Sequence, residues 1–142
     1  MPERVAIVGS RRFPALWLVR AFIADLPPGT IVVSGGAPGV DTAAAEAAKD
    51  CGLSVVEYHA DWDGLGRKAG PIRNHRIVMD ADRIVAFWDG VSRGTLNSVR
   101  IAHDLGKPVQ IIGADGQAVT LAQALSAATA LKVRGVITGL TE

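Results

Sequence analysis

The sequence predicts an α/β fold: a Rossmann-like, doubly wound, mainly parallel sheet in the order 3-2-1-4-5, with helices on both faces. Two observations predict it. First, four short β-branched runs lack polar alternation, which is typical of strands covered on both faces. These runs are residues 5–8, 31–33, 84–87 and 109–112. Second, segments of helical length separate the runs, and strands alternating with helices form parallel sheets with right-handed crossovers.

The remaining elements are predicted from apolar spacing and from the proline and glycine residues that end helices. Four helices are expected at residues 14–26, 40–51, 94–105 and 119–131. A weaker fifth strand is predicted at residues 53–58. Residues 60–71 form a polar segment with several glycines, and a loop this long in a compact domain is usually functional. Residues 132–142 are either an extra strand or an oligomer contact.

Composition limits the class of protein. The chain has 142 residues, so we expect a single domain over residues 1–142. Hydrophobic residues make up 49% and charged residues 20%, which excludes a disordered chain. The net charge of +1 excludes a polyanion-binding tail. Trp17 and the lone Cys51 are predicted to pack in the interior.

The sequence also predicts where the protein is located and whether it assembles. We see no signal peptide and no apolar run long enough to span a membrane, so we expect a cytoplasmic protein with no membrane partner. Mean hydropathy is +0.25, which is high for a small monomer. The last helix and the tail are apolar enough to form an interface. We therefore expect a homo-oligomer, a dimer or larger.

The unusual residues collect where the predicted strands end. The segments are residues 9–12, 34–41, 61–74 and 88–95. In doubly wound sheets the ligand lies beyond the carboxyl ends of the strands, near the point where strand order reverses. Glycine lets backbone N–H groups approach a phosphate, and a helix N-terminus adds partial positive charge. These segments therefore predict an anion site for a phosphorylated small molecule.

Thirteen residues are predicted to bind the ligand. Gly35, Gly36, Gly39, Gly94 and Thr95 would hold phosphate through backbone N–H groups, and Arg11 and Arg73 would pair with its charge. Asp61 and Trp62 would contact the base or sugar. The complete set is Gly9, Ser10, Arg11, Ser34, Gly35, Gly36, Gly39, Asp61, Trp62, Arg73, Asn74, Gly94 and Thr95.

Simpler interpretations stand beside these roles. Glycines at strand-to-helix turns often serve turn geometry alone. Asp41 is placed to cap a helix, Trp62 to close the long loop, and Arg12 and Arg76 to lie in solvent. The histidines and Cys51 have no metal-ligand spacing, and neither a P-loop nor a G-x-G-x-x-G fingerprint is present. No metal and no cofactor are therefore expected.

At these loops the sequence resembles the SLOG superfamily of Rossmann-like proteins, and most closely its YspA-like branch. The resemblance covers roughly residues 5–112 and rests on four ordered blocks. They are residues 8–11, residues 34–41, Ala60-Asp61-Trp62 with residues 68–74, and Gly94-Thr95. The resemblance implies a Rossmann-like fold that binds nucleotides or their derivatives, with a sensor or ligand-binding role. This is the main functional prediction.

Two relatives within that superfamily supply alternatives. In Lonely Guy phosphoribohydrolases, an arginine and a Gly-Thr pair resemble Arg73 and Gly94-Thr95, but Ser98 stands where their catalytic Glu belongs. A serine cannot carry that charge. If the chain cuts the N-glycosidic bond of a nucleoside monophosphate, Arg73 would take part, and Asp41, Asp61 and Asp89 are candidates to replace the Glu.

The DNA-processing protein A group, which binds single-stranded DNA, has a glycine block that resembles residues 34–41. Net charge of +1 and 5% aromatic residues argue against a nucleic-acid track. Local positive charge is nevertheless predicted, because seven basic residues fall at the site edge: Arg11, Arg12, Arg67, Lys68, Arg73, Arg76 and Arg93. The predicted partner is a small-molecule nucleotide and not nucleic acid, with single-stranded DNA binding as the second alternative.

Overall fold

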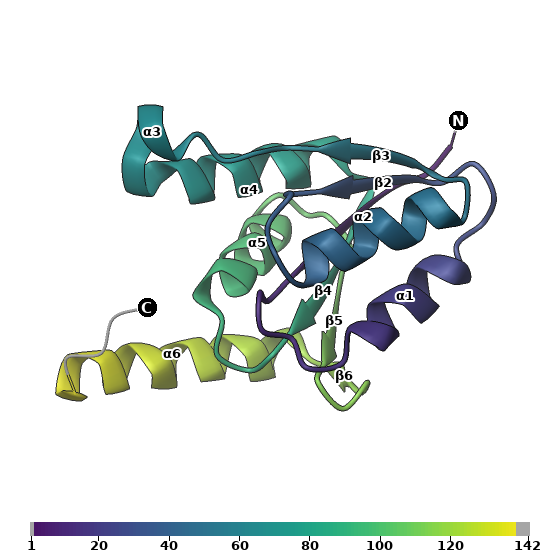
Figure 1. Cartoon of the computed structure of the whole chain (residues 1–142). Coiled ribbons are helices and arrows are strands. Elements are labelled where there is room, and N and C mark those ends of the chain that lie inside the picture. Colours follow the sequence, from purple (N-terminus) through teal and green to yellow (C-terminus); the bar gives the residue numbers. More distant parts are fainter. Residues whose placement is uncertain (1, 139–142) are drawn as a thin grey trace.

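The computed structural model describes residues 2–138 and confirms the predicted α/β sheet (Figure 1). One six-stranded sheet has the order β3-β2-β1-β4-β5-β6. The first five strands pair in parallel, and β6 adds an antiparallel edge beside β5. The strands are β1 (Arg4–Gly9), β2 (Ile31–Ser34), β3 (Ser54–Glu57), β4 (Arg83–Trp88), β5 (Val109–Gly113) and β6 (Ala118–Val119).

Helices cover both faces of the sheet. They are α1 (Leu16–Ala24), α2 (Val40–Asp50), α3 (Trp62–Leu65), the 3-10 turn η1 (Gly66–Lys68), α4 (Ala69–Asp80), α5 (Arg93–Asp104) and α6 (Leu121–Thr138). Alternate residues of β1 show the two layers. Val5 and Ile7 pack with the buried side chains of α1 and α2, and Ala6 and Val8 pack with those of α4 and α5. Such two-sided burial explains why the strands lack polar alternation.

Helix α4 is the main element that the sequence analysis missed, because residues 68–74 were treated as part of a loop block. Pro71 lies in the first turn of α4, where its missing N–H costs no helical hydrogen bond. The apolar positions of the helix are few, with Ile77 and Val78 buried near its end. Residues 69–80 therefore have too few apolar residues at helical spacing to predict a helix. In the structure, α4 forms one wall of the site.

Other predictions on packing are wrong. Trp17 lies on α1 with 66% of its surface exposed, and Cys51 is exposed at the end of α2. Helix α6 continues to Thr138, so residues 132–138 form no extra strand. Residues 139–142 lie outside the described part of the chain. Within residues 2–138, no helix is long and apolar enough to cross a membrane.

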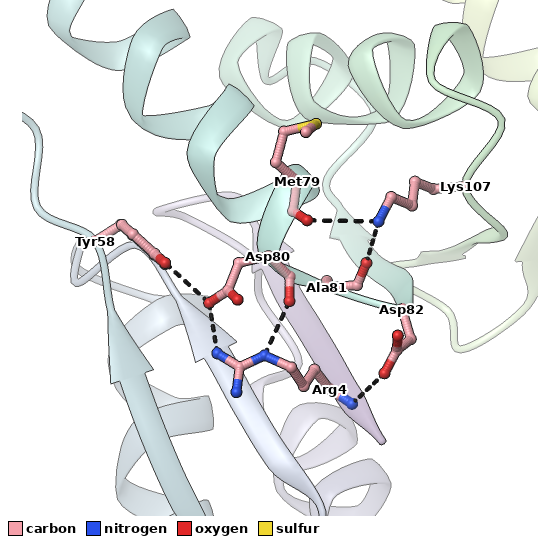
Figure 2. A network of polar contacts seen from close by, with 7 residues as sticks. All are labelled: Arg4, Tyr58, Met79, Asp80, Ala81, Asp82 and Lys107. Carbon is pink, nitrogen blue, oxygen red and sulfur yellow. Dashed lines mark hydrogen bonds and ion pairs between the residues drawn. The ribbon is translucent and has the colours of Figure 1, made fainter. Parts of the chain in front are cut away.

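A polar network fastens α4 at the amino end of the sheet (Figure 2). Arg4 on β1 donates from Nη2 to the Asp80 carboxylate at 2.6 Å and from Nε to the Asp80 carbonyl oxygen at 3.0 Å. The Tyr58 hydroxyl donates to the same carboxylate at 2.9 Å. Lys107 donates to the carbonyl oxygen of Ala81 at 2.7 Å. The last turn of α4 is therefore tied to three segments of the chain, which fixes its opposite end at the site.

Candidate functional site

A cleft of about 1230 Å³ lies at the carboxyl edge of the parallel strands. It is lined by the loop after β1, the start of α2, α3, one face of α4, the turn after β4, and α5. This is the predicted position for a site in a doubly wound sheet. The volume exceeds the range of about 300–1,000 Å³ that small-molecule pockets usually have. The cleft is thus larger than a single small ligand requires.

Helical spacing brings the two walls together. On α4, Gly70, Arg73, Asn74 and Ile77 line the cleft at intervals of three and four residues, and so share one face. On α5, the lining residues include Arg93, Asn97 and Arg100, which follow the same periodicity. Packing of α4 against α5 sets the two faces side by side.

Positive charge is concentrated in this cleft although the chain is nearly neutral. Six arginines line it, against two carboxylates, Asp41 and Asp89. The arginines are Arg11, Arg12, Arg67, Arg73, Arg93 and Arg100. In a concave site, side chains of one sign reinforce one another and raise the local concentration of the opposite charge. The surface of the cleft is therefore strongly cationic, although the net charge of the whole chain is only +1.

The loop between β2 and α2 holds one of those carboxylates inside the protein. Asp41 is only 6% exposed, and its Oδ2 accepts a hydrogen bond from the backbone N–H of Ala37 at 3.2 Å. A Cβ atom on Gly35 would lie 2.7 Å from Arg73 Nη1 and 2.8 Å from Asp41 Oδ2. A larger residue there would force the end of the Arg73 or Asp41 side chain to shift. The first turn of α2 thus already holds an anion, the side chain of Asp41.

Burial governs the titration of this pair. Burial raises the pKa of Asp41 to about 6, although the hydrogen bond from Ala37 and the charges of Arg73 and Arg11 favour the carboxylate. Burial also lowers the pKa of Arg73. The negative charge of Asp41 raises this pKa, whereas the positive charge of Arg11 lowers it further. Arg73 Nη1 donates to the carbonyl oxygen of Gly35 at 2.6 Å. Arg73 is therefore held by protein groups on one side and faces the cleft on the other.

A second chain of hydrogen bonds crosses the floor of the cleft from α4 to α5. Arg73 Nε donates to Asn74 Oδ1 at 3.0 Å. Asn74 Nδ2 donates to Asn97 Oδ1 at 3.0 Å and, at 3.4 Å, to the carbonyl oxygen of Gly94. Asn74 is 8% exposed, so these contacts satisfy a nearly buried amide. They fix the orientation of each side chain in the series.

The turn between β4 and α5 uses its polar groups internally. Asp89 Oδ1 accepts from the backbone N–H groups of Val91 and Ser92 at 3.0 and 2.9 Å. Ser92 caps α5 by accepting from Thr95 N at 3.4 Å. The buried Ser10 hydroxyl accepts from Asp89 N at 3.1 Å and lies 3.4 Å from Thr95 Oγ1. Asp89 therefore acts as a turn-forming carboxylate in this structure.

The short helix α3 places an aromatic ring at the rim. Asp61 caps this helix by accepting from Gly64 N at 3.0 Å. Trp62 follows it, is 51% exposed and lines the cleft. A Cβ atom on Gly70 would lie 3.1 Å from Trp62 Cη2, so the indole rests close to the start of α4. A smaller hollow of about 230 Å³ adjoins this region, between His59 and the loop at Gly36.

The structure brings most predicted site residues together. Seven of the thirteen predicted ligand-binding residues line the large cleft: Gly9, Arg11, Trp62, Arg73, Asn74, Gly94 and Thr95. Gly35 and Gly36 line the smaller hollow. Four residues line neither: Ser10, Ser34, Gly39 and Asp61. Ser10 and Ser34 are buried beneath the site and Asp61 caps α3.

Three other residues refine the prediction. Arg12, predicted to be only solvated, lines the cleft, and so do Asn97 and Arg100, which the sequence analysis did not select. The spacing of Arg93, Asn97 and Arg100 on one helical face is the signal that could have found the last two.

Ser98 is buried, and its hydroxyl donates to the Gly94 carbonyl oxygen at 3.5 Å. Among residues 2–138, no cluster of side chains suited to a metal ion occurs.

Comparison with known proteins identifies the relatives. The Gene 61 protein of Mycobacterium phage D29 is 40% identical over 117 residues, covering 75% of this chain and 94% of that protein. The chain belongs to the family of this phage protein. In addition, residues 1–61 match the family of DNA recombination-mediator protein A. The expected resemblance to the DNA-processing protein A group is thereby confirmed.

Two solved structures share the fold of this chain. DNA processing protein A from Streptococcus pneumoniae superposes with a TM-score of 0.70 at 22% identity, over 94% of this chain. DNA processing protein A from Helicobacter pylori, which binds single-stranded DNA, superposes with a TM-score of 0.57 at 23% identity, over 78% of this chain. The chain spans 57% and 65% of the lengths of these two proteins.

These relatives overturn two predictions. The main functional prediction, a sensor or binder of a small phosphorylated nucleotide, is wrong, and so is the prediction that nucleic acid is not a partner. The physical errors were to treat the glycine loop as an empty phosphate site and to assign the basic residues at the site edge to a small phosphate pocket. Asp41 already lies in that loop, and six arginines line one open cleft.

Proposed function

We propose that this chain binds single-stranded DNA in the cleft between α4, α5 and the loop after β1. The observation that carries the proposal is the lining of six arginines around an open cleft with a half-exposed tryptophan at its rim. Proteins that bind single strands combine a positively charged groove with aromatic side chains on which bases stack. The single-stranded DNA binding of the H. pylori relative supports the same choice.

The cleft offers a separate contact for each part of a strand. Arg12, Arg67 and Arg100 are exposed and line the cleft, so their guanidinium groups would pair with successive phosphates. Trp62 would stack on a base. Of the predicted ligand-binding residues, Arg11 and Arg73 are the cationic ones, and we keep them as contacts to the strand. Backbone at Gly94 and Thr95 would approach it from the start of α5.

The test is a titration of a fluorescently labelled oligo(dT) of about 20 nucleotides, followed by anisotropy between about 50 and about 200 mM salt. We expect log affinity to fall linearly with log salt, by about 0.7 for each phosphate neutralised. Arg67→Ala and Arg100→Ala should each weaken binding and each reduce that slope by about one phosphate contact. Arg20→Ala is the matched control, because Arg20 is exposed on α1 and does not line the cleft.

Two results would contradict the proposal. The first is an affinity for oligo(dT) that does not depend on salt. The second is equal weakening by Arg20→Ala and by the cleft variants, because contacts would then be spread over the whole surface. An unlabelled duplex of the same length serves as competitor. We expect it to displace the single strand poorly, since its stacked bases cannot reach Trp62.

The finer classification stays a prediction. The YspA-like branch of the SLOG superfamily and the relation to Lonely Guy enzymes rest on the sequence blocks described above. A single domain over residues 1–142 is likewise our expectation. Of the candidate catalytic residues, Asp41 and Asp89 each accept backbone hydrogen bonds, and Arg73 is bonded to Gly35. We assign these three residues to the shape and charge of the cleft.

A further inference from the structure

The orientation of Asn97 follows from a chain of donors that begins at Arg73. A guanidinium group can only donate, so the Asn74 atom that faces Arg73 Nε at 3.0 Å must be the oxygen. The other end of the Asn74 amide is then its nitrogen, which can only donate. The Asn97 atom that faces it at 3.0 Å must therefore be Oδ1. The amide orientations are fixed by chemistry rather than by a choice between similar atoms.

This arrangement leaves the nitrogen of Asn97 for a ligand. Asn97 is half-buried on the wall of the cleft, one helical turn from Arg100. Its Oδ1 is occupied by Asn74. Within residues 2–138, Asn97 Nδ2 makes no hydrogen bond of its own. The side chain therefore presents the two N–H donors of Nδ2 to whatever occupies the cleft, while one lone pair of its Oδ1 is used by Asn74.

We propose that Asn97 is a specificity-determining residue that donates a hydrogen bond to a base carbonyl oxygen of the bound strand. This inference rests on the proposed function. The arginines are the stronger partners for phosphates, because their charge is permanent and their geometry is bidentate. A neutral amide between the helices is left for the uncharged acceptors of the strand, which include the carbonyl oxygens of thymine, cytosine and guanine.

Part of the acceptor capacity of Asn97 is already used. An asparagine usually reads adenine by donating to N7 and accepting from the N6 amino group. Asn97 Oδ1 already accepts from Asn74 with one of its two lone pairs, which directs the oxygen toward α4. A base with a carbonyl oxygen needs only a donor and is satisfied by Nδ2. We therefore expect a base with a carbonyl oxygen at this position, and oligo(dT) supplies one at every nucleotide.

The experiment compares two strands that differ only in acceptors. One is oligo(dT); the other carries difluorotoluene, a thymine-shaped base without carbonyl oxygens, in place of the central thymines. We expect the native protein to bind the modified strand about threefold to tenfold more weakly, the value of one hydrogen bond. Asn97→Ala should weaken oligo(dT) binding by the same factor and bind both strands equally.

The variant and its control are chosen to keep the fold. Alanine is the better helix former, and in Asn97→Ala the Asn74 amide keeps its contact with the Gly94 carbonyl oxygen. Thermal unfolding of the variant checks this directly. His103→Ala is the control on the same helix, because His103 is exposed in the last turn of α5 and does not line the cleft. It should discriminate between the two strands as the native protein does.

The outcomes separate this inference from the proposed function. If no strand binds, the proposed function fails. If strands bind with the expected salt dependence but the native protein does not discriminate, only the role of Asn97 is overturned. A third result also overturns it: Asn97→Ala weakens both strands equally and reduces the salt slope, which would place Asn97 on a phosphate.

Discussion

The carboxylate of Asp41 lies inside the loop between β2 and α2, where its Oδ2 accepts a 3.2 Å hydrogen bond from the backbone N–H of Ala37. Arg73 approaches the same loop from α4 and donates to the carbonyl oxygen of Gly35. A glycine-rich loop at a helix N-terminus is a site where anions bind. In this chain a protein carboxylate is already placed there, and its burial makes it sensitive to pH.

The first prediction concerns the stability of the native protein and Asp41→Asn. The pKa of Asp41 rises from its ordinary value of 3.8 to about 6 on folding, mainly because the group is buried. The folded state therefore binds more protons than the unfolded state between these values. The free energy of unfolding of the native protein should fall as pH rises through this window, by up to about 3 kcal/mol from this group. Asp41→Asn should lack this fall.

Urea unfolding at about pH 4.5 and about pH 7 measures the difference between native protein and variant at each pH. We expect the variant to gain stability relative to the native protein at the higher pH. Because other carboxylates also titrate, only this difference isolates Asp41. An unchanged difference at the two pH values would show that Asp41 is not buried as a titrating carboxyl.

The second prediction contrasts two glycines of the site. A Cβ atom on Gly9 would lie 2.6 Å from both the Phe87 carbonyl oxygen and Val40 Cγ1, whereas one on Gly94 would meet nothing within 4 Å. Gly9→Ala should therefore lower the free energy of unfolding by about 1–3 kcal/mol, the usual cost of overpacking. Gly94→Ala lies in the first turn of α5 and should raise it by about 0.5–1 kcal/mol.

Urea unfolding of both variants checks this contrast, and oligo(dT) binding adds a second readout. A stable Gly94→Ala variant that binds the strand more weakly would support the predicted contact of Gly94 with the ligand. Equal destabilisation by the two substitutions would contradict the packing described here, since only Gly9 lies against backbone.

The sheet could be predicted from sequence because each of its buried strands is a short apolar run, and the parallel order follows from the alternation with helices. The edge strand β6 has only two residues, Ala118 and Val119, and leaves no such signal. Helix α4 was missed for a different reason. Its cleft-facing side carries Arg73 and Asn74, so polar residues stand where an ordinary helix has the apolar residues that make it predictable.

The cleft lies where the topological argument expects a site, because strands that run in parallel end at one edge. Its chemistry was misjudged because the predicted local positive charge was assigned to a phosphate pocket for a small molecule. Which arginines meet depends on the packing of α4 against α5, which places Arg73 and Arg100 in the same cleft. The surroundings of Asp41 could not be foreseen either, since Arg73, whose charge favours the carboxylate, comes from α4.

The third prediction concerns the network at the amino end of the sheet (Figure 2). Burial alone raises the pKa of Asp80, but the hydrogen bonds from Arg4 and Tyr58 outweigh it and lower that pKa. The contribution to stability is therefore present above the ordinary carboxyl pKa and lost only as pH falls through the lowered value. Asp80→Asn should cost about 1–2 kcal/mol at neutral pH, because the pair is partly exposed.

A double-mutant cycle with Arg4→Ala and Asp80→Asn measures the coupling directly. We expect each variant to weaken the effect of the other, since both remove the same 2.6 Å contact. The coupling should be the same at about pH 5.5 and about pH 7, because Asp80 stays charged at both. Strictly additive effects would show that this contact between Arg4 and the Asp80 carboxylate contributes nothing to stability.

The fourth prediction uses the three tryptophans as reporters of the cleft. Trp62 is 51% exposed at the rim, Trp17 is 66% exposed on α1 outside the cleft, and Trp88 is 5% exposed with its Nε1 bonded to the Ser92 carbonyl oxygen. If a base stacks on Trp62, oligo(dT) should quench the fluorescence of that indole. Trp62→Phe should abolish most of the quenching and keep part of the affinity, since phenylalanine still offers an aromatic face. Trp17→Phe, the matched control, should retain both, so quenching that survives in Trp62→Phe but disappears in Trp17→Phe would place the strand over α1.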